Sequence, residues 1–379
     1  MACALAQSGR HRILAYTAAL GEEILQRLGG EARRVSDPEE ILADPAVEAV
    51  VIAGHPSVRP AQLRRALQSE RQVLCVHPLD QTPEIAYEAA MIRNDTGCVL
   101  LPLLPEATHP AFRRLAEFVR RKDGDGSPIG TFRLLAMERG AAEEVLDGIW
   151  IAGQKPSFPG WDILRTVGGE IQEVSAFAEQ EELGESEPVL VAGRFEQGGL
   201  FQLTLMPREK APGWRLTLAG SDGRAELFFP LGWNGPAYLN WADENGEPHE
   251  ESWERWDPWP VLVEMFEQTV ERRAGVGAGL PTGPRLTWQD AIRGLELDDA
   301  ARRSVERRRS SLLEYPEATE EVGFKGTMTL LGCGLVWAVL LMMILSVWWP
   351  KVGWLIVPLL VVFLALQFLR YLLPGRRGE

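Results

Sequence analysis

A histidine lies where an apolar run ends, in the sequence VLCVHPL at residues 73–79. The run has the composition of a buried strand, and the helical spacing of DQTPEIAYEAAMI follows it. Ligands of α/β proteins bind at the carboxyl ends of parallel strands, so His77 lies where such a protein holds its chemistry. An imidazole can act there as a base or donate a hydrogen bond to a substrate hydroxyl. We favour the alternative, a histidine that only caps the strand end, because catalysis requires several groups together.

Strand-like and helix-like segments alternate from residue 11 to about 121, which predicts a doubly wound parallel sheet of Rossmann type. The run at 47–54, VEAVVIAG, is expected to be buried on both faces of this sheet. Ser36, with Glu39 three residues on, is the expected N-cap of a helix. The other expected strands are 12–17, 72–76 and 98–103, and helices are expected between them and after the last.

The first nine residues, MACALAQSG, resemble the last turns of a helix and have no strand before them. A dinucleotide fold needs a strand and a glycine-rich turn there, whose backbone amides hold the pyrophosphate. The run 12–17 also ends without the acidic residue that binds a ribose hydroxyl. We therefore expect no cofactor for the chain as given, and NAD or NADP if the true start lies upstream of Met1. The glycines of GVGAG (275–279) follow a helix, so they are interpreted as a connection and not as a phosphate loop.

Strand patterns dominate from about residue 128 to 259 and predict a large, mostly antiparallel sheet. EQGG and GSDG are expected hairpin turns within it. A final helix is expected to begin with a Thr287/Asp290 capping pair. Several tryptophans occur in the last part of this region: Trp233, Trp241, Trp253, Trp256 and Trp259. Such residues could stack on a sugar ring, but we favour packing between the sheet and a helix.

Charge and cysteine content exclude several functions. The formal net charge is −14, which argues against a nucleic-acid partner, because phosphate binding needs a concentrated basic surface. The four cysteines lack the spacing of a zinc site or a disulfide framework, and no metal site is expected. Cys75 and Cys98 are expected in the core.

Two uncharged apolar runs, 329–349 and 352–369, are each long enough to cross a bilayer. Arginines and lysines flank the pair on both sides, which predicts a transmembrane hairpin in the cytoplasmic (inner) membrane, multi-pass, with the remaining chain facing the cytoplasm. The lipid bilayer is thus an expected partner. The expected domains are a truncated Rossmann-like domain at 1–122, an α/β domain at 123–311, a linker at 312–326 and the hairpin at 327–374.

Most of residues 1–310 resembles the Gfo/Idh/MocA (glucose–fructose oxidoreductase / inositol dehydrogenase) family. The segments that carry the resemblance are residues 44–90, THPAFRRLAEFV, RFEQGGLFQLTL, GRAELFFP and LTWQDAIRGLELDDAARRSVERRR. The resemblance implies a Rossmann domain followed by an α/β domain with a large open sheet that commonly mediates oligomers. It also implies NAD- or NADP-dependent oxidation or reduction of sugars and cyclitols, and hence a sugar-like small molecule as ligand.

The family's catalytic residues differ at the matching positions. Its Glu-Lys-Pro motif corresponds to Val76, His77 and Pro78, so the resemblance places His77 at the lysine position. Its Asp-x-x-x-His motif corresponds to Lys155 and Pro159, and only Asp162, just beyond, remains.

The resemblance also implies cofactor-side residues. These are Gly54, His55, Pro56 and Ser57, at and after the end of the expected strand 47–54, together with Pro78. His55 and Arg59 depart from the common pattern of this loop, whereas Pro56 and Ser57 keep it.

Three hypotheses follow. The first, which we prefer at this stage, is a membrane-anchored relative with degenerate motifs that serves as a non-catalytic ligand-binding or scaffold module. The second is an active NAD(P)-dependent sugar or cyclitol oxidoreductase whose true N-terminus lies upstream of Met1. The third is an assembly partner in which the membrane hairpin is the functional part. The resemblance also implies a homo-oligomer through the second-domain sheet as one expected partner arrangement.

Overall fold

The computed structural model describes residues 1–18, 20–29, 31–77, 82–120, 127–141, 160–178, 188–207, 213–230, 235–243, 245–273, 286–307 and 311–312. Residue contacts group Met1–Glu314 into one compact unit, and the following account concerns this unit.

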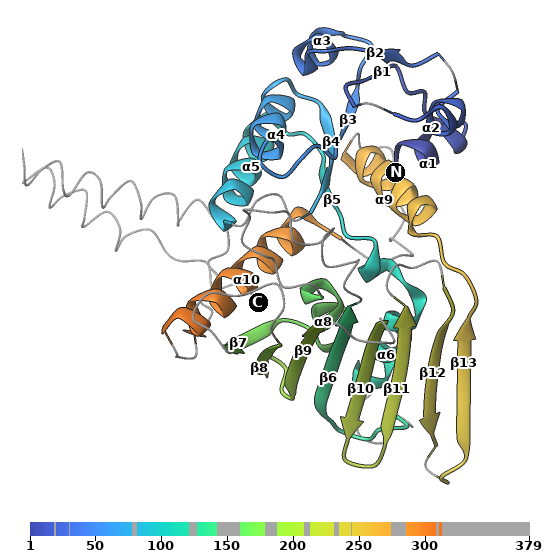
Figure 1. Cartoon of the computed structure of the whole chain (residues 1–379), viewed down its shortest axis with the longest axis vertical. Helices are drawn as coiled ribbons and strands as arrows, with labels where there is room; N and C mark the ends of the chain where they lie inside the picture. Colours follow the sequence, from blue (N-terminus) through green and yellow to red (C-terminus); the bar gives the residue numbers. More distant parts are fainter. Residues whose placement is uncertain are drawn as a thin grey trace, which may run out of the picture. The chain divides into compact units, whose positions relative to one another are not determined.

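A three-stranded parallel sheet forms the centre of the first half of the chain. Its strands β3 (Ala49–Ile52), β4 (Gln72–Val76) and β5 (Leu100–Leu103) pair in this order. Alternate residues of β4 point to opposite faces of the sheet. Val73 and Cys75 pack toward helices α4 (Arg59–Gln68) and α5 (Pro83–Thr96). Leu74 packs on the other face, toward α1 (Ala2–Gln7) and α9 (Pro258–Arg273). The Rossmann-like α/β fold is therefore confirmed (Figure 1).

Two short strands, β1 (Ala15–Tyr16) and β2 (Arg33–Arg34), form a separate parallel pair; helices α2 (Glu22–Arg27) and α3 (Pro38–Ala43) follow them in turn. Among the described strands β3 pairs only with β4, so β3 is an edge strand. This position explains why the prediction of a fully buried 47–54 run is wrong: Ala49 is exposed and Val50 and Val51 are half-buried.

One predicted helix cap is shifted by a residue. The N-cap of α3 is Asp37, not Ser36, and its side chain accepts a hydrogen bond from the backbone N–H of Glu39 at 3.0 Å. Pro38 follows as the first helical residue, where its fixed φ and missing N–H suit a helix start. The position of Pro38 thus sets where the cap lies.

A nine-stranded mixed sheet dominates the second half, in the order β13-β12-β11-β10-β6-β9-β8-β7-β14. Only β6 and β9 pair in parallel; the other neighbours are antiparallel, as predicted, and the EQGG and GSDG turns join antiparallel strands. The strands are β6 (Phe132–Ala141), β7 (Ile171–Ala178), β8 (Val189–Phe195), β9 (Leu200–Pro207), β10 (Gly213–Gly220), β11 (Arg224–Pro230), β12 (Ala237–Ala242), β13 (Pro248–Trp253) and β14 (Ser311–Leu312). The apolar core of this sheet includes residues of α6 (Pro110–Arg120) and α8 (Trp161–Gly168).

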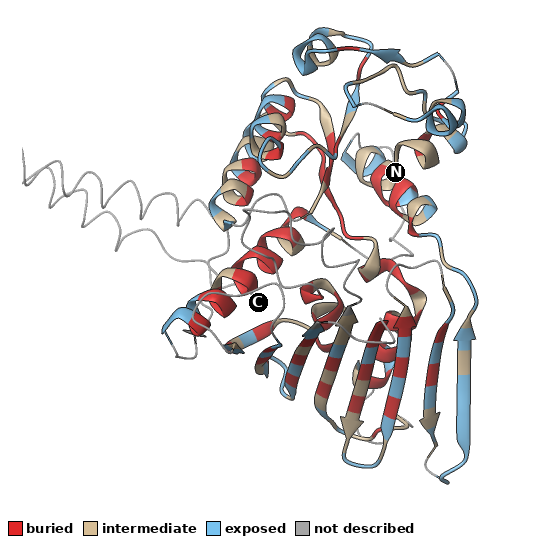
Figure 2. Cartoon of the chain, viewed as in Figure 1, coloured by how far each residue is buried: buried red, intermediate tan, exposed pale blue. Residues whose placement is uncertain are grey.

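Helix α10 (Trp288–Arg307) contributes to both cores. Trp288 and Leu295 belong to the core of the parallel sheet, whereas Leu297 and Val305 belong to the core of the nine-stranded sheet. Figure 2 shows the resulting burial along most of the helix. The predicted cap is confirmed: the Asp290 carboxylate accepts hydrogen bonds from the backbone N–H and the hydroxyl of Thr287, at 2.7 and 2.8 Å.

The tryptophans lie mainly against apolar side chains. Trp241 and Trp253 pack against the core of the nine-stranded sheet, and Trp259 packs against the core beside α9. The Trp241 ring also stacks on His249. These contacts favour the packing interpretation over a sugar-binding stripe; Trp233 lies outside the described residues.

The expected location in a membrane is corrected. Across the described ranges, no helix is both long and apolar enough to span a bilayer. Helix α10 has 20 residues, but Asp, Glu and Arg side chains occur along its whole length, which excludes it from the hydrocarbon layer. The two apolar runs that suggested a hairpin, 329–349 and 352–369, lie outside the described residues.

Candidate functional site

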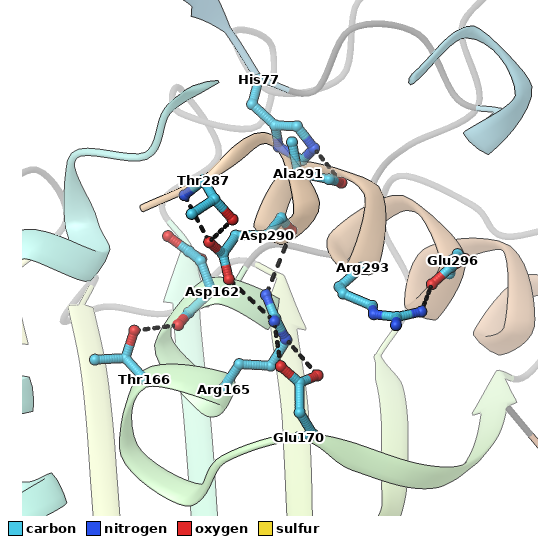
Figure 3. Close-up of polar contacts among 10 residues, drawn as sticks. All are labelled: His77, Asp162, Arg165, Thr166, Glu170, Thr287, Asp290, Ala291, Arg293 and Glu296. Carbon is cyan, nitrogen blue, oxygen red and sulfur yellow. Dashed lines mark hydrogen bonds and ion pairs between the residues drawn. The ribbon is translucent and has the colours of Figure 1, made fainter. Parts of the chain in front are cut away.

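His77 directly follows β4 and contacts the first turns of α10 (Figure 3). Its Nε2 atom lies 3.1 Å from the carbonyl oxygen of Ala291, which can only accept, so Nε2 carries the proton and donates. A Cβ built on Gly294 would lie 3.4 Å from Cε1 of His77, so the ring packs directly against α10 at this position. Burial is the main cause that lowers the pKa of His77 to about 4. His77 is therefore neutral at pH 7 and its N–H is engaged by α10.

The loop after β3 holds the other residues expected to face a cofactor. His55 Nδ1 and the Ser57 hydroxyl lie 2.8 Å apart, and both side chains are exposed. Beneath them, buried Arg59 donates to the carbonyl oxygens of Gly54, at 2.7 Å, and Val76, at 3.3 Å. Arg59 thus ties the loop to the carboxyl end of β4. Pro78 lies outside the described residues.

Sequence reasoning missed a carboxyl pair next to this edge of the sheet. Glu106 begins the short 3-10 helix η1 (Glu106–Thr108) after β5, and Asp162 lies in the first turn of α8. Burial first, and then the charge of Asp162, raise the pKa of Glu106 to about 7, although Arg139 opposes the rise. Burial also raises the pKa of Asp162, whose carboxylate accepts hydrogen bonds from the backbone N–H groups of Ala107 and Ile163.

An ion-pair bridge joins α8 to α10. The Arg165 guanidinium lies 2.5 Å from Glu170 and 3.1 Å from Asp290, and the side chain is 9% exposed. Asp290 immediately precedes Ala291, the partner of His77. Figure 3 shows these contacts over the start of α10. The first turn of α10 therefore contacts both the end of β4 and the helix that carries Asp162.

Together these elements place two kinds of chemistry at the carboxyl edge of the parallel sheet. The Glu106/Asp162 pair can hold and release a proton near pH 7, because two close carboxyls cannot both ionise freely. His55 and Ser57 offer exposed polar groups from the loop after β3. Lys155 and Pro159, the other positions considered, lie outside the described residues, and within the described ranges no cluster of His, Cys, Asp and Glu could hold a metal ion.

A nicotinamide dinucleotide is the cofactor that this fold implies. The loop Gly54–Ser57 lies at the carboxyl edge of the sheet, and its role toward a cofactor stays a prediction. The described part contains no strand that leads through a glycine-rich turn into a helix, so the backbone amides that would bind a pyrophosphate are not among these residues.

The chain has the fold of a two-domain Rossmann-type oxidoreductase. Residues 12–103 match the family model described as "Oxidoreductase family, NAD-binding Rossmann fold", that of Gfo/Idh/MocA. A comparison with curated proteins gives no match.

Solved structures share most of the fold. A levoglucosan dehydrogenase in complex with NADH and levoglucosan has a TM-score of 0.64 at 14% identity, over 83% of this chain and 96% of that chain. An aldose-aldose oxidoreductase from Caulobacter crescentus complexed with glycerol gives 0.62 at 16% identity, over 80% and 92%. A probable dehydrogenase from Thermotoga maritima gives 0.60 at 21% identity, over 82% and 95%. At these identities the likeness establishes the fold alone.

Proposed function

We propose that this protein is an NAD(P)-dependent oxidoreductase of a polyhydroxylated substrate, of the sugar or cyclitol class. The observation that carries the proposal is the Glu106/Asp162 pair, held beside the carboxyl edge of a Rossmann-like sheet whose residues 12–103 match an NAD-binding family model. Titratable groups with strongly shifted pKa values concentrate at functional sites. The structural neighbours that act on levoglucosan and aldoses support the substrate class.

The carboxyl pair, rather than His77, is the proposed proton-transfer group. Oxidation of an alcohol requires a base that accepts the hydroxyl proton, and a group with a pKa near the working pH is the most effective one. The pKa of Glu106 is about 7, whereas that of His77 is about 4 and its N–H is engaged by Ala291. Glu106 and Asp162 are both half-buried, so each keeps some exposed surface toward a ligand.

The test is turnover by the full-length chain. NAD⁺ or NADP⁺ reduction is followed by absorbance while inositols and aldoses are supplied one at a time. We expect activity with at least one polyol, and we expect Glu106→Gln to lower kcat by about 10²–10⁴-fold with NADH affinity retained. Glu196→Gln, which changes an exposed turn residue, is the matched control. Absence of both turnover and nicotinamide binding, or full activity in Glu106→Gln, contradicts the proposal.

A ligand-binding module without turnover is the second candidate function. The neutral, helix-bound His77 at the position that resembles the family lysine favours it, because this imidazole is a poor base. Titration calorimetry with polyols separates the two functions. Saturable polyol binding with no reduction of either nucleotide supports the binding module.

A further inference from the structure

A cavity of about 620 Å³ lies at the amino end of β5, the end of the parallel sheet opposite to His77. Its walls come from the end of α5, the second half of α9 and the start of α10. The volume is within the range of pockets that bind small organic molecules. This cavity is therefore separate from the site at the carboxyl edge.

Three arginines line the cavity: Arg93 from the last turn of α5, and Arg272 and Arg273 from the last turn of α9. Among the described residues, the lining contains no aspartate or glutamate. Part of this charge suits the carboxyl ends of the two helices, where cations are stabilised. Arg272, for example, donates from Nε to the carbonyl oxygen of Gln268 at 3.1 Å.

The stabilisation of cations at helix ends does not explain why Arg93 and Arg273 lie next to each other. Arg273 lies against Gly97, where an added Cβ would overlap its guanidinium. Burial and, second, the charge of Arg273 lower the pKa of Arg93. Arg93 donates only to the neutral amide oxygen of Asn94, at 2.8 and 3.3 Å, among the contacts of the described residues. Two guanidinium groups held close together without a carboxylate are an arrangement that a bound anion would stabilise.

The rest of the lining is apolar, which restricts the ligand further. Leu286 and Met265 supply the apolar surface of the lining, and Leu100 and Trp288 belong to the core next to it; Thr269 and Gln268 supply polar groups beside the arginines. A free inorganic anion would leave this apolar surface without contacts. A molecule that combines an oxyanion with an apolar or aromatic body would use both parts of the cavity.

We propose that this cavity is a second binding site, which takes small organic anions that carry a phosphate or carboxylate on an apolar body. Arg93 and Arg273 bind the oxyanion, and Leu286 with Met265 contacts the body. The inference is independent of the proposed redox function, because none of these four residues belongs to the site at the carboxyl edge of the sheet.

Titration calorimetry of the full-length chain with phenyl phosphate tests the proposal, with inorganic phosphate and phenol as comparison probes. We expect saturable binding of phenyl phosphate, weaker binding of inorganic phosphate, none of phenol, and no displacement by saturating NADH. Arg93→Gln and Arg273→Gln are each expected to weaken binding by about tenfold or more. Arg33→Gln, at an exposed position of β2, is the control and keeps the affinity.

Thermal unfolding in phosphate-free buffer distinguishes a binding role from a structural one. Removing one of two repelling charges should leave the Tm of Arg273→Gln unchanged or raised, whereas a structural arginine would lower it when removed. Where a glutamine variant does not fold, Arg273→Lys replaces it, with several-fold weaker binding expected, because lysine lacks the bidentate fork. The proposal is overturned by absence of saturable phenyl phosphate binding, or by unchanged affinity in the arginine variants.

Discussion

The indole Nε1 of Trp288 donates a hydrogen bond to the carbonyl oxygen of Ala86 at 2.9 Å. This bond joins the first residue of α10 to the first turn of α5, and both residues are buried. It fixes the start of the helix that also binds His77 through Ala291 and Arg165 through Asp290. The position of the whole candidate site therefore depends on how α10 begins.

Trp288→Phe should lower the free energy of unfolding by about 0.5–1.5 kcal/mol, because it removes the side-chain hydrogen bond to the Ala86 carbonyl, which keeps its bond within α5. Trp288→Ala should cost about 3–5 kcal/mol, since it adds a cavity to the lost bond. Urea unfolding followed by far-UV circular dichroism measures both. An equal, small loss in the two variants would contradict the packing role assigned to this ring.

The lowered pKa of His77 predicts a loss of stability in acid. Its folded pKa of about 4 lies below the ordinary histidine pKa of 6.5, so the unfolded chain binds the proton more readily between these pH values. The contribution of His77 to the free energy of unfolding is therefore complete above pH 6.5. It decreases toward pH 4 by an amount on the order of 3 kcal/mol. His77→Gln, whose amide can still donate to Ala291, should remove this part of the pH dependence.

His109 titrates in the same direction, so it must be separated from His77. Its side chain is fully buried, and burial lowers its pKa to about 4. The double variant His77→Gln/His109→Gln should therefore flatten the acid side more than either single variant. His249→Gln, at an exposed site, is the control for loss of an imidazole. An unchanged acid profile in the double variant would contradict both assignments.

The raised pKa of Glu106 predicts the opposite pH dependence of stability. Its folded pKa of about 7 lies above the usual 4.5, so the folded chain keeps the proton and loses stability as the pH rises from 4.5 to 7. Glu106→Gln imitates the protonated form and should raise the free energy of unfolding at pH 8 by roughly 1–3 kcal/mol. Thermal unfolding of the variant at pH 5 and pH 8 measures the effect, which should be small at pH 5. Destabilisation at pH 8 would show that the carboxylate is instead held favourably.

Exposed apolar side chains form a row across the nine-stranded sheet. The register pairs Phe177 of β7 with Leu190 of β8, and Phe228 of β11 with Tyr238 of β12. Between these two pairs, the same row runs through Thr204 of β9 and then through the Glu138–Arg215 ion pair of β6 and β10. Apolar side chains exposed in such a row are typical of an interface, and the homo-oligomer expected through this sheet stays a prediction.

Phe177→Glu combined with Phe228→Glu should therefore convert an oligomer to a monomer, measured by light scattering after size-exclusion chromatography. The matched control is Met91→Glu, because Met91 is 65% exposed on α5, away from this sheet. A monomeric unchanged protein, or an oligomer that persists in the double variant, would contradict an interface on this face.

Sequence patterns predicted the regular elements well where local signals agreed. Strand β4 covers the expected residues 72–76, and α5 begins at Pro83, as expected, and is capped by Gly97, whose φ of 74° favours glycine. The run 12–17 yields just the two-residue β1, since strand length depends on partners that are distant in sequence. The burial of 47–54 was overestimated for the same reason.

The candidate site was predicted only in part. His77 was found from its place at a strand end, and its neutral, bonded state fits the strand-end interpretation, but its catalytic role stays a prediction. Glu106 was missed, although an acidic residue directly after the strand-like run 98–103 is a usable signal. What makes it unusual is Asp162 and the burial around both, and no local pattern encodes that proximity.

Helix α10 completes two hydrophobic cores at once. Residues from Trp288 to Leu295 pack in the core of the parallel sheet, and residues from Leu297 to Val305 pack in the core of the nine-stranded sheet. The helix therefore cannot leave one core without disrupting the other. The two sheets are thereby joined thermodynamically as well as covalently. We therefore expect the two sheets to melt in one cooperative step on heating, with a single heat-absorption peak for the unit Met1–Glu314.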